Sequence, residues 1–308
     1  MTIAFISNSD CGRHDTGWGH AEHVGRLRAI PSALREHPEL IGRIHHVESR
    51  HATVDELALA HDRAYIETVR AIVASGGGQL DVDTVASEGS WDAATAATGA
   101  VLDGLDFAFG AGPRRSFCGV RPPGHHAVRD RAMGFCLFGS VAIGAHYARR
   151  HHGAERVLIV DWDVHHGNGT QALVEDDRDI RFISMHQWPW YPGTGAADDR
   201  GPHANVWNRP MRAGLPASVY VDTLERAIDE ATADFTPDIV LISAGFDSLA
   251  GDPLGGFTLE YEHVEQLTRG LVERAEQWCG GRVVSALEGG YAPQRLAQAC
   301  VHHMLALE

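Results

Sequence analysis

One stretch of the chain, residues 157–170, joins the pattern of a buried strand to a dense set of potential metal ligands. It reads VLIVDWDVHHGNGT, an apolar run followed by Asp161, Asp163 and His165 at every second position. Because alternate side chains of an extended chain share one face, these three are expected to converge, with His166 turned away. Asp oxygen and His nitrogen are both zinc ligands. An isolated Asp-x-His is usually a solvated loop, but the preceding strand and the following glycines favour a site.

A third candidate ligand follows a later apolar run. Asp247 stands just past residues 239–244, and the carboxyl ends of parallel strands meet at one edge of a sheet. Asp163, His165 and Asp247 would leave one coordination position open, as catalytic zinc sites do, whereas structural sites are closed and usually contain Cys. Zinc held there would polarise an acyl carbonyl and lower the pKa of water. The pattern therefore predicts metal-assisted hydrolysis of an amide.

Groups for acid–base catalysis follow two further strand patterns. The segment RPPGHHA places His125 and His126 on a loop that two prolines keep rigid. An imidazole there is a suitable general base because its ordinary pKa lies near neutral pH, and Asp161 and Asn168 are candidate partners for the second ring nitrogens. Tyr291, placed by two glycines in LEGGY, can donate a hydrogen bond to a developing oxyanion. The chain has no GxSxG motif, which disfavours a serine hydrolase.

Two loops leave alternatives open. The segment WPWYPGTG, residues 188–195, is typical of the wall of a narrow pocket and equally of an aromatic cluster that pins a long loop. His14, His20 and His23 lie in an early loop, and their irregular spacing is more typical of a surface loop than of a ligand set.

The segments between these motifs alternate between strand and helix patterns, which predicts a mostly parallel sheet covered by helices on both faces. Strands are expected at residues 3–6, 116–120, 157–160, 180–185, 239–244 and 282–286. Helices are expected at residues 26–37, 54–60, 63–74, 91–109, 137–150, 218–235, 261–278 and 294–307, with another that begins near residue 170. Residues 80–89 and 187–212 are expected to be loops.

The composition narrows the partners. The chain of 308 residues carries a formal net charge of −15, which argues against direct nucleic-acid binding. The same charge suits a cationic substrate such as a lysine-rich peptide or a polyamine, although acidic surfaces also serve solubility alone. All 26 basic residues are Arg, which excludes a lysine Schiff base or a lysine general base.

Compartment and domain organisation are constrained as well. The start, MTIAFISNSD, lacks a secretory pattern and no apolar run reaches membrane-spanning length, so a cytoplasmic protein without membrane contact is expected. The five cysteines are scattered without a CxxC pair and are expected to be buried thiols. No linker or repeat interrupts the chain, which favours one domain.

The motifs RPPGHHA, GFC, DWDVHHGNGT, SMHQ, YPGTG, AGFDSLAGDP and EGGY resemble, in this order, those of the zinc-dependent histone deacetylase family. They are most similar to its class II and bacterial amidohydrolase branch, and the resemblance extends from the HAEHVGRL segment to Tyr291. It implies a three-layer arginase/deacetylase fold, in which an eight-stranded, mostly parallel sheet lies between helices. Residues 1–308 would then form a single deacetylase catalytic domain.

The resemblance also implies a role for each candidate residue at the centre of the site. One zinc ion would be bound by Asp163, His165 and Asp247. His126 would act as general base and then acid, with His125 as its electrostatic partner. Tyr291 would polarise the acetyl carbonyl, while Asp161 pairs with His125 and Asn168 with His126. A structural potassium ion would be bound by the side chains of Asp161 and Ser184 and by carbonyls that include those of Asp163, His165 and Met185.

The substrate residues are implied in the same way. An acyl-lysine tunnel would run between Phe135 and Tyr191, lined also by Gly134, with Asp83 at its rim. Leu254 stands where polyamine-specific relatives can carry an acidic gatekeeper, which favours acyl-lysine peptides without excluding polyamines, since contacts in a homo-oligomer can also gate a tunnel.

Two departures from the family pattern affect the rim. Ala21 and Val24 replace the usual prolines of the early segment, and Tyr191 stands where many relatives have Phe. A differently shaped rim loop and a different acyl preference are therefore expected.

The leading hypothesis is a deacylase of Nε-acyl-lysine in proteins or peptides. An acetylpolyamine or other small-amide deacetylase is the alternative. A two-metal ureohydrolase of the arginase type is disfavoured because ligands for only one zinc are found. A catalytically silent acyl-lysine binding module is expected to have lost a ligand or Tyr291, and none is lost here.

Overall fold

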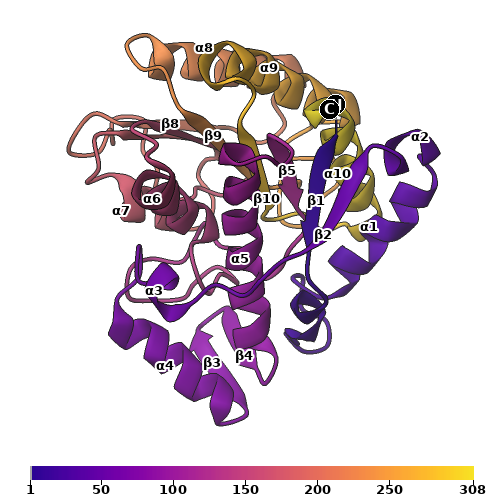
Figure 1. The fold of residues 1–308 in the computed structure, drawn as a ribbon, viewed down its shortest axis with the longest axis vertical. Helices are drawn as coiled ribbons and strands as arrows, with labels where there is room; N and C mark the ends of the chain where they lie inside the picture. The colour runs from indigo at the N-terminus through magenta and orange to yellow at the C-terminus, as the bar shows by residue number, and fades with distance from the viewer. Residues whose placement is uncertain (1) are drawn as a thin grey trace.

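An eight-stranded sheet forms the centre of the computed structural model, which describes residues 2–308 (Figure 1). Every pairing between neighbouring strands of this sheet is parallel, which confirms the predicted α/β architecture. In spatial order the strands are β2 (Ile44–Glu48), β1 (Ile3–Ser7), β5 (Arg115–Cys118), β10 (Val283–Leu287), β9 (Ile239–Ala244), β6 (Val157–Asp161), β7 (Ile180–Gln187) and β8 (Val206–Met211).

The central strands are buried on both faces because their sequences are continuous apolar runs. In β6, Leu158 and Val160 contribute to one hydrophobic core, while the intervening Ile159 contributes to the other. Residues of β9 alternate in the same way. The sheet therefore separates two apolar layers, as expected of a parallel sheet with helices on both sides.

Helices cover both layers. One face carries α1 (Gly25–Arg35), α8 (Ala217–Thr232), α9 (Tyr261–Cys279) and α10 (Pro293–Leu307). The other face carries α3 (Val54–Leu57), α4 (Arg63–Ala74), α5 (Ser90–Phe109), α6 (Ser140–His152) and α7 (Asn168–Val174). A short helix α2 (Pro38–Ile41) and a 3-10 helix η1 (Ser9–Arg13) complete the described part of the chain. Figure 1 shows the two groups, with α8 and α9 at the top and α3 and α4 at the bottom.

Three regions differ from the sequence prediction. Residues 80–89, expected to be a loop, contain part of an antiparallel hairpin formed by β3 (Gly77–Asp81) and β4 (Thr84–Ser87). Residues 187–212, also expected to be a loop, contain the edge strand β8, and the opposite edge strand β2 was not predicted either. Edge strands pair on one side only and tolerate polar residues and proline, so IHHVE and VWNRPM lack the apolar run that marks an inner strand.

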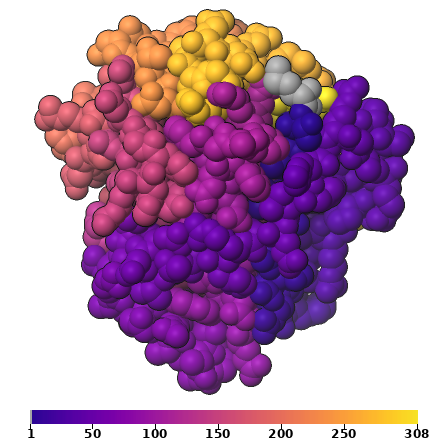
Figure 2. Space-filling model, viewed as in Figure 1, coloured from indigo at the N-terminus to yellow at the C-terminus, as the bar shows by residue number. Residues whose placement is uncertain are grey.

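The segments near the two ends of the chain lie side by side, as the indigo and yellow atoms of Figure 2 show. Arg43 Nη1 lies 2.8 Å from the Glu308 carboxylate, and α1 packs against α10. All five cysteines are buried and free, as predicted. None of the helices within residues 2–308 combines the length and apolarity needed to cross a bilayer.

Candidate metal centre and active site

The predicted site residues gather at the carboxyl ends of the sheet strands. Four neighbouring central strands, β5, β10, β9 and β6, end there, and the loop after each carries part of the site. These loops begin at Gly119, Glu288, Gly245 and Trp162. Because the strands are adjacent and parallel, residues separated by more than 160 positions in sequence meet at this edge.

Asp163, His165 and Asp247 form a buried group of potential metal ligands. Their donor atoms all lie within 4.8 Å of one another. His165 Nδ1 is 2.9 Å from Asp163 Oδ1 and 3.3 Å from Asp247 Oδ2. Strand β6 ends at Asp161, so the chain bends over 163–165 instead of continuing extended as the spacing argument assumed. The three side chains converge nevertheless.

The charges of this group suit a divalent cation. Burial alone would lower the pKa of His165, but hydrogen bonds and charge from Asp163 and Asp247 outweigh it and raise that pKa to about 10. Burial, together with the Asp163 charge, raises the pKa of Asp247 to about 7. Apart from His165 Nδ1, Asp247 Oδ2 has no hydrogen-bond partner within the described residues. The crowding of two buried carboxylates favours positive charge at this point, and a cation with nitrogen and oxygen ligands would supply it.

Gly289 is required by this crowding. Its N–H donates to Asp163 Oδ2 at 2.8 Å, and a Cβ at this position would collide with the carboxylates of both Asp163 and Asp247. The first glycine of LEGGY therefore has a steric role beside the metal ligands, in addition to helping to place Tyr291.

The two adjacent histidines have different partners. His125 Nδ1 lies 3.0 Å from Asp161 Oδ2, and His126 Nδ1 lies 2.8 Å from Asn168 Oδ1. An amide oxygen only accepts, so His126 carries its proton on Nδ1 and leaves Nε2 free to accept one. The predicted pairings are thus both present in the structure.

The pKa values of the pair move in opposite directions. Burial and the neighbouring His125 and His165 rings lower the pKa of His126. Burial also opposes charge on His125, but the charges of Asp163 and Asp161 outweigh it and raise the pKa of His125. The arrangement therefore favours a neutral His126 beside a positively charged His125.

A cavity of about 200 Å³ leads to these groups. It is lined by all five predicted substrate residues, namely Asp83, Gly134, Phe135, Tyr191 and Leu254, together with His126, His165, Trp190 and Tyr291. The aromatic segment therefore forms a pocket wall, which was one of its two interpretations.

The cavity wall is held by specific contacts. The Tyr191 ring stands edge-on to His126 with centroids 5.1 Å apart, and Phe135 meets Tyr291 at 5.9 Å. Trp190 Nε1 donates to the Leu254 carbonyl at 2.9 Å. These contacts connect four loops, which follow β5, β7, β9 and β10, around one opening.

The rim carboxylate links the hairpin to the His-bearing loop. Asp83 Oδ1 accepts the Gly134 N–H at 3.0 Å. Gly134 has φ of +57°, and a Cβ there would collide with the His126 ring, so glycine is needed at this point. Burial, with the Asp83 charge added, raises the pKa of Tyr191.

The predicted potassium ligands lie behind the metal group. Asp161 and Ser184 are register partners in β6 and β7, and both are fully buried, as is Met185. Ser184 Oγ is 3.0 Å from His186 Nδ1, while His186 Nε2 is 2.9 Å from the Gly195 carbonyl. The carbonyl requires a proton on Nε2, so Ser184 donates to Nδ1 and keeps its oxygen lone pairs for another partner.

A buried ionic network was not anticipated from the sequence. Glu22 accepts from Arg121 at 2.6 and 2.7 Å and from Arg26 at 3.1 Å, and all three are fully buried. His14, expected in a surface loop, is buried and bonds to Ser90 Oγ at 2.7 Å. The correction has a simple cause, since the early loop folds over Arg121 and its carbonyls accept from that guanidinium.

Asp252 is another residue that sequence reasoning missed. Its Oδ2 accepts the Tyr291 N–H at 2.7 Å, and its Oδ1 accepts the Leu254 N–H at 2.9 Å. Its position five residues after Asp247 was the only available signal.

Comparisons with known proteins show which proteins this chain is similar to. A family profile described as histone deacetylase domain matches residues 20–307. The chain is 35% identical over 279 residues to the histone deacetylase-like amidohydrolase of Pseudomonas aeruginosa, covering 89% of this chain and 73% of that protein. It is 34% identical over 313 residues to a probable deacetylase of Methanothermobacter thermautotrophicus, covering 100% and 91%. The crystal structure of the HDA15 HD domain matches with a TM-score of 0.92 and 34% identity, over 99% of this chain and 88% of that one.

Proposed function

Because this chain belongs to the histone deacetylase family and is a metal-dependent hydrolase of acetylated substrates, we propose that it removes acyl groups from Nε-acyl-lysine in peptides and proteins. The observation that carries this proposal is the narrow cavity between Phe135 and Tyr191, which ends at the metal-ligand group. Its aromatic walls suit the four-carbon stem of lysine, with the acyl group at the deep end. We propose further that residues 1–308 act as one catalytic domain.

We propose zinc as the ion, with Asp163, His165 and Asp247 as its ligands. When bound, such a cation polarises the acyl carbonyl and lowers the pKa of water. Asp163 and His165 are oriented independently of it, because Gly289 N–H donates to Asp163 and the His165 N–H donates to Asp163 Oδ1 at 2.9 Å. Three features of these ligands support zinc: they offer nitrogen and oxygen donors, they are buried, and the group they form is open toward the cavity.

The proton transfers would be carried by His126. Its free Nε2 accepts a proton from the attacking water and later delivers it to the departing lysine amine. His125, held by Asp161, provides positive charge beside the developing negative charge. The Tyr291 hydroxyl, which lines the same cavity, donates to the carbonyl oxygen as it gains charge.

A structural potassium ion is proposed beside Asp161 and Ser184. The hydrogen-bond pattern of Ser184 leaves its lone pairs available, and an oxygen-rich site suits a hard monovalent cation. Positive charge there would stabilise the buried Asp161 carboxylate that holds His125.

Acetylpolyamines are the second candidate substrates. The net charge of −15 and the rim carboxylate of Asp83 favour a cation at the mouth. Against them, Leu254 offers no charge where a gatekeeping acid would bind a second ammonium group.

Steady-state kinetics distinguish the two. We expect kcat/KM for an acetyl-lysine peptide to exceed that for acetylputrescine and acetylspermidine, measured on protein whose metal content is determined in the same preparation. A large preference for the polyamines would overturn the proposal. Longer acyl-lysine peptides in the same panel would define the acyl preference that Tyr191 imposes.

A further inference from the structure

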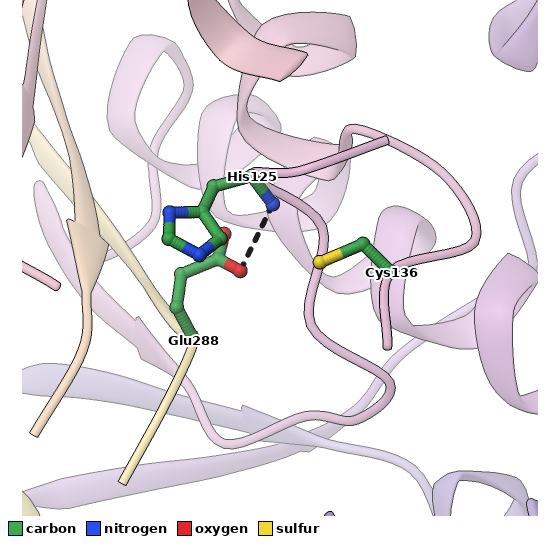
Figure 3. Close-up of side chains that lie close together, drawn as sticks. All are labelled: His125, Cys136 and Glu288. Carbon is green, nitrogen blue, oxygen red and sulfur yellow. Dashed lines mark hydrogen bonds between the residues drawn. The ribbon is translucent and has the colours of Figure 1, made fainter. Parts of the chain in front are cut away.

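Glu288 is a buried carboxylate that this mechanism does not use. It follows β10 directly and is 1% exposed. Its Oε2 accepts the N–H of Gly124 at 2.6 Å and the N–H of His125 at 3.1 Å. Figure 3 shows the Glu288 carboxylate next to His125, with Cys136 across from both. The carboxylate therefore reaches from the loop that bears Tyr291 to the loop that bears both histidines.

The group His125, Cys136 and Glu288 is compact enough to suggest a second metal site, but its donor atoms are committed elsewhere. His125 directs Nδ1 at Asp161 and has Nε2 3.7 Å from Asp163. Burial raises the pKa of the Cys136 thiol, which disfavours the thiolate that a metal needs. Glu288 Oε2 already holds two amides. Hydrogen bonding of the Glu288 carboxylate to backbone N–H groups, and not metal binding, therefore accounts for the closeness of these three side chains.

The sequence of the histidine loop explains why an acceptor is needed there. Pro122 and Pro123 have no N–H, so Gly124 and His125 carry the first backbone donors of the bend, and both are buried. A buried N–H without an acceptor is costly, and a carboxylate is a stronger acceptor than a neutral group. Glu288 satisfies two such donors with one oxygen.

The other end of Glu288 is equally constrained. Its carbonyl accepts from the Arg26 guanidinium, whose Nε also donates to the Gly290 carbonyl at 2.7 Å. Its N–H donates to the Ala244 carbonyl at 3.0 Å, which fixes it to the end of β9. The carboxylate therefore projects from a backbone that is already tied to two other parts of the molecule.

We propose that Glu288 is a positioning residue that sets the placement of His126 relative to Tyr291, and hence the distance between general base and oxyanion donor. This inference rests on the roles proposed above for those two residues. The reacting groups belong to loops that contact each other through Glu288, so loss of its acceptor lets the histidine loop shift. A shift of about 1 Å is enough to lower a rate about 100-fold.

The test compares Glu288→Leu, which removes the acceptor, with Glu288→Gln, which keeps one acceptor oxygen. For Leu we expect kcat to fall about 100-fold with KM and metal content unchanged. For Gln we expect recovery to within about fivefold of wild type, because a neutral oxygen still accepts both N–H groups. Amide hydrogen exchange over residues 124–127 should accelerate in the Leu variant and stay protected in the Gln variant.

Asn205→Leu is the matched control. Asn205 is buried, and its Nδ2 donates to the Ile180 carbonyl at 2.9 Å and to the Asp177 carbonyl at 3.1 Å, at the amino end of β7 and therefore away from the carboxyl ends that carry the site. It should lower the melting temperature and leave kcat unchanged. If Glu288→Leu does not fold, Glu288→Asp replaces it, since the shorter carboxylate cannot reach both amides and should be slower than Gln.

Three results would overturn the proposal: wild-type kcat in the variant without an acceptor, a Gln variant as slow as Leu, or unchanged exchange at residues 124–127. The rates are measured on whichever acetylated substrate the wild-type enzyme hydrolyses. A protein that prefers polyamines would therefore contradict the lysine proposal and still test this one.

Discussion

At the floor of the cavity, Asp163, His165 and Asp247 are buried at strand ends, whereas at its mouth Trp190 and Tyr191 are 45% and 37% exposed on a loop. The backbone next to neighbouring strand ends donates hydrogen bonds to the side chains of the floor, as the Gly289 N–H does to Asp163. Mouth residues hold one another through single contacts between loops, such as Trp190 with Leu254. The difference teaches that the proposed metal ligands are fixed by the sheet, while the residues at the mouth can change without disturbing it.

Among changes at the floor, Asp163→Ala should cause the largest loss of activity. It removes a proposed ligand and the acceptor of two N–H groups, so we expect kcat/KM to fall about 1,000-fold or more together with loss of bound metal. Peptide deacetylation and metal analysis of dialysed protein measure both effects. Asp83→Asn, the equivalent change at the mouth, should keep the metal. Activity near wild type in Asp163→Ala would contradict the proposed centre.

Tyr291→Phe tests the proposed oxyanion donor, which lies beside the floor, without removing a metal ligand. The ring contact with Phe135 is retained, so only the donated hydrogen bond is lost, and we expect kcat to fall about 100-fold with little change in KM. A loss confined to KM would instead assign Tyr291 to substrate binding, as at the mouth.

Asn168→Asp sharpens the comparison within the floor, because it gives His126 the kind of partner that His125 has. A carboxylate on Nδ1 favours the charged imidazole and raises the pKa of His126. The base is then protonated at neutral pH, so we expect the acid limb of the kcat/KM profile to move to higher pH and activity at pH 7 to fall about tenfold. An unmoved profile would show that His126 is not the base.

The pH dependence of metal binding tests the floor as an electrostatic unit. In the metal-free protein His165 has a pKa of about 10, so binding must release its proton, and affinity should rise about tenfold per pH unit between pH 7 and pH 9. Below pH 7 protonation of Asp247, whose pKa is about 7, should steepen the slope. Competition with a chelator of known affinity measures this, and a flat profile would contradict it.

The smallest effect is expected at the mouth. Leu254→Glu places a carboxylate near Asp83, so we expect the ratio of kcat/KM for acetylspermidine to that for the peptide to rise about fivefold, with metal content unchanged. Leu254→Gln is the uncharged control and should leave the ratio unchanged. An equal response in both variants would mean that shape, not charge, sets the preference.

The inner strands could be predicted from the sequence, whereas the edge strands and the hairpin could not. The inner strands and their terminal residues were predictable because an apolar run followed by Asp, His or Gly marks both the strand and its end, as at Asp161 and Asp247. Edge strands β2 and β8 lack that run, and eight strands were expected only from the family resemblance. The hairpin β3–β4 was hidden by glycines at 76–78, which resemble a helix cap as closely as a strand start.

Long-range polar partners were harder to predict. The pairing of Asp161 with His125 followed from the family pattern, but nothing local marks Glu22 as the partner of Arg121 at a separation of 99 residues. Such contacts depend on loops whose paths are set only once the sheet is complete. They therefore belong to tertiary structure and leave no periodic signal along the chain.

Strand β10 lies between β5 and β9 although it follows both in sequence. Without β10, the strands of this sheet fall into two groups, β2-β1-β5 and β9-β6-β7-β8, and β5 and β9 each lack a partner on the facing side. His126 belongs to one half and Asp163 to the other, and only the insertion of β10 brings them to a common edge. Pairing of β10, the last strand of the chain, therefore covers two strand edges and joins the two halves of the site in one step.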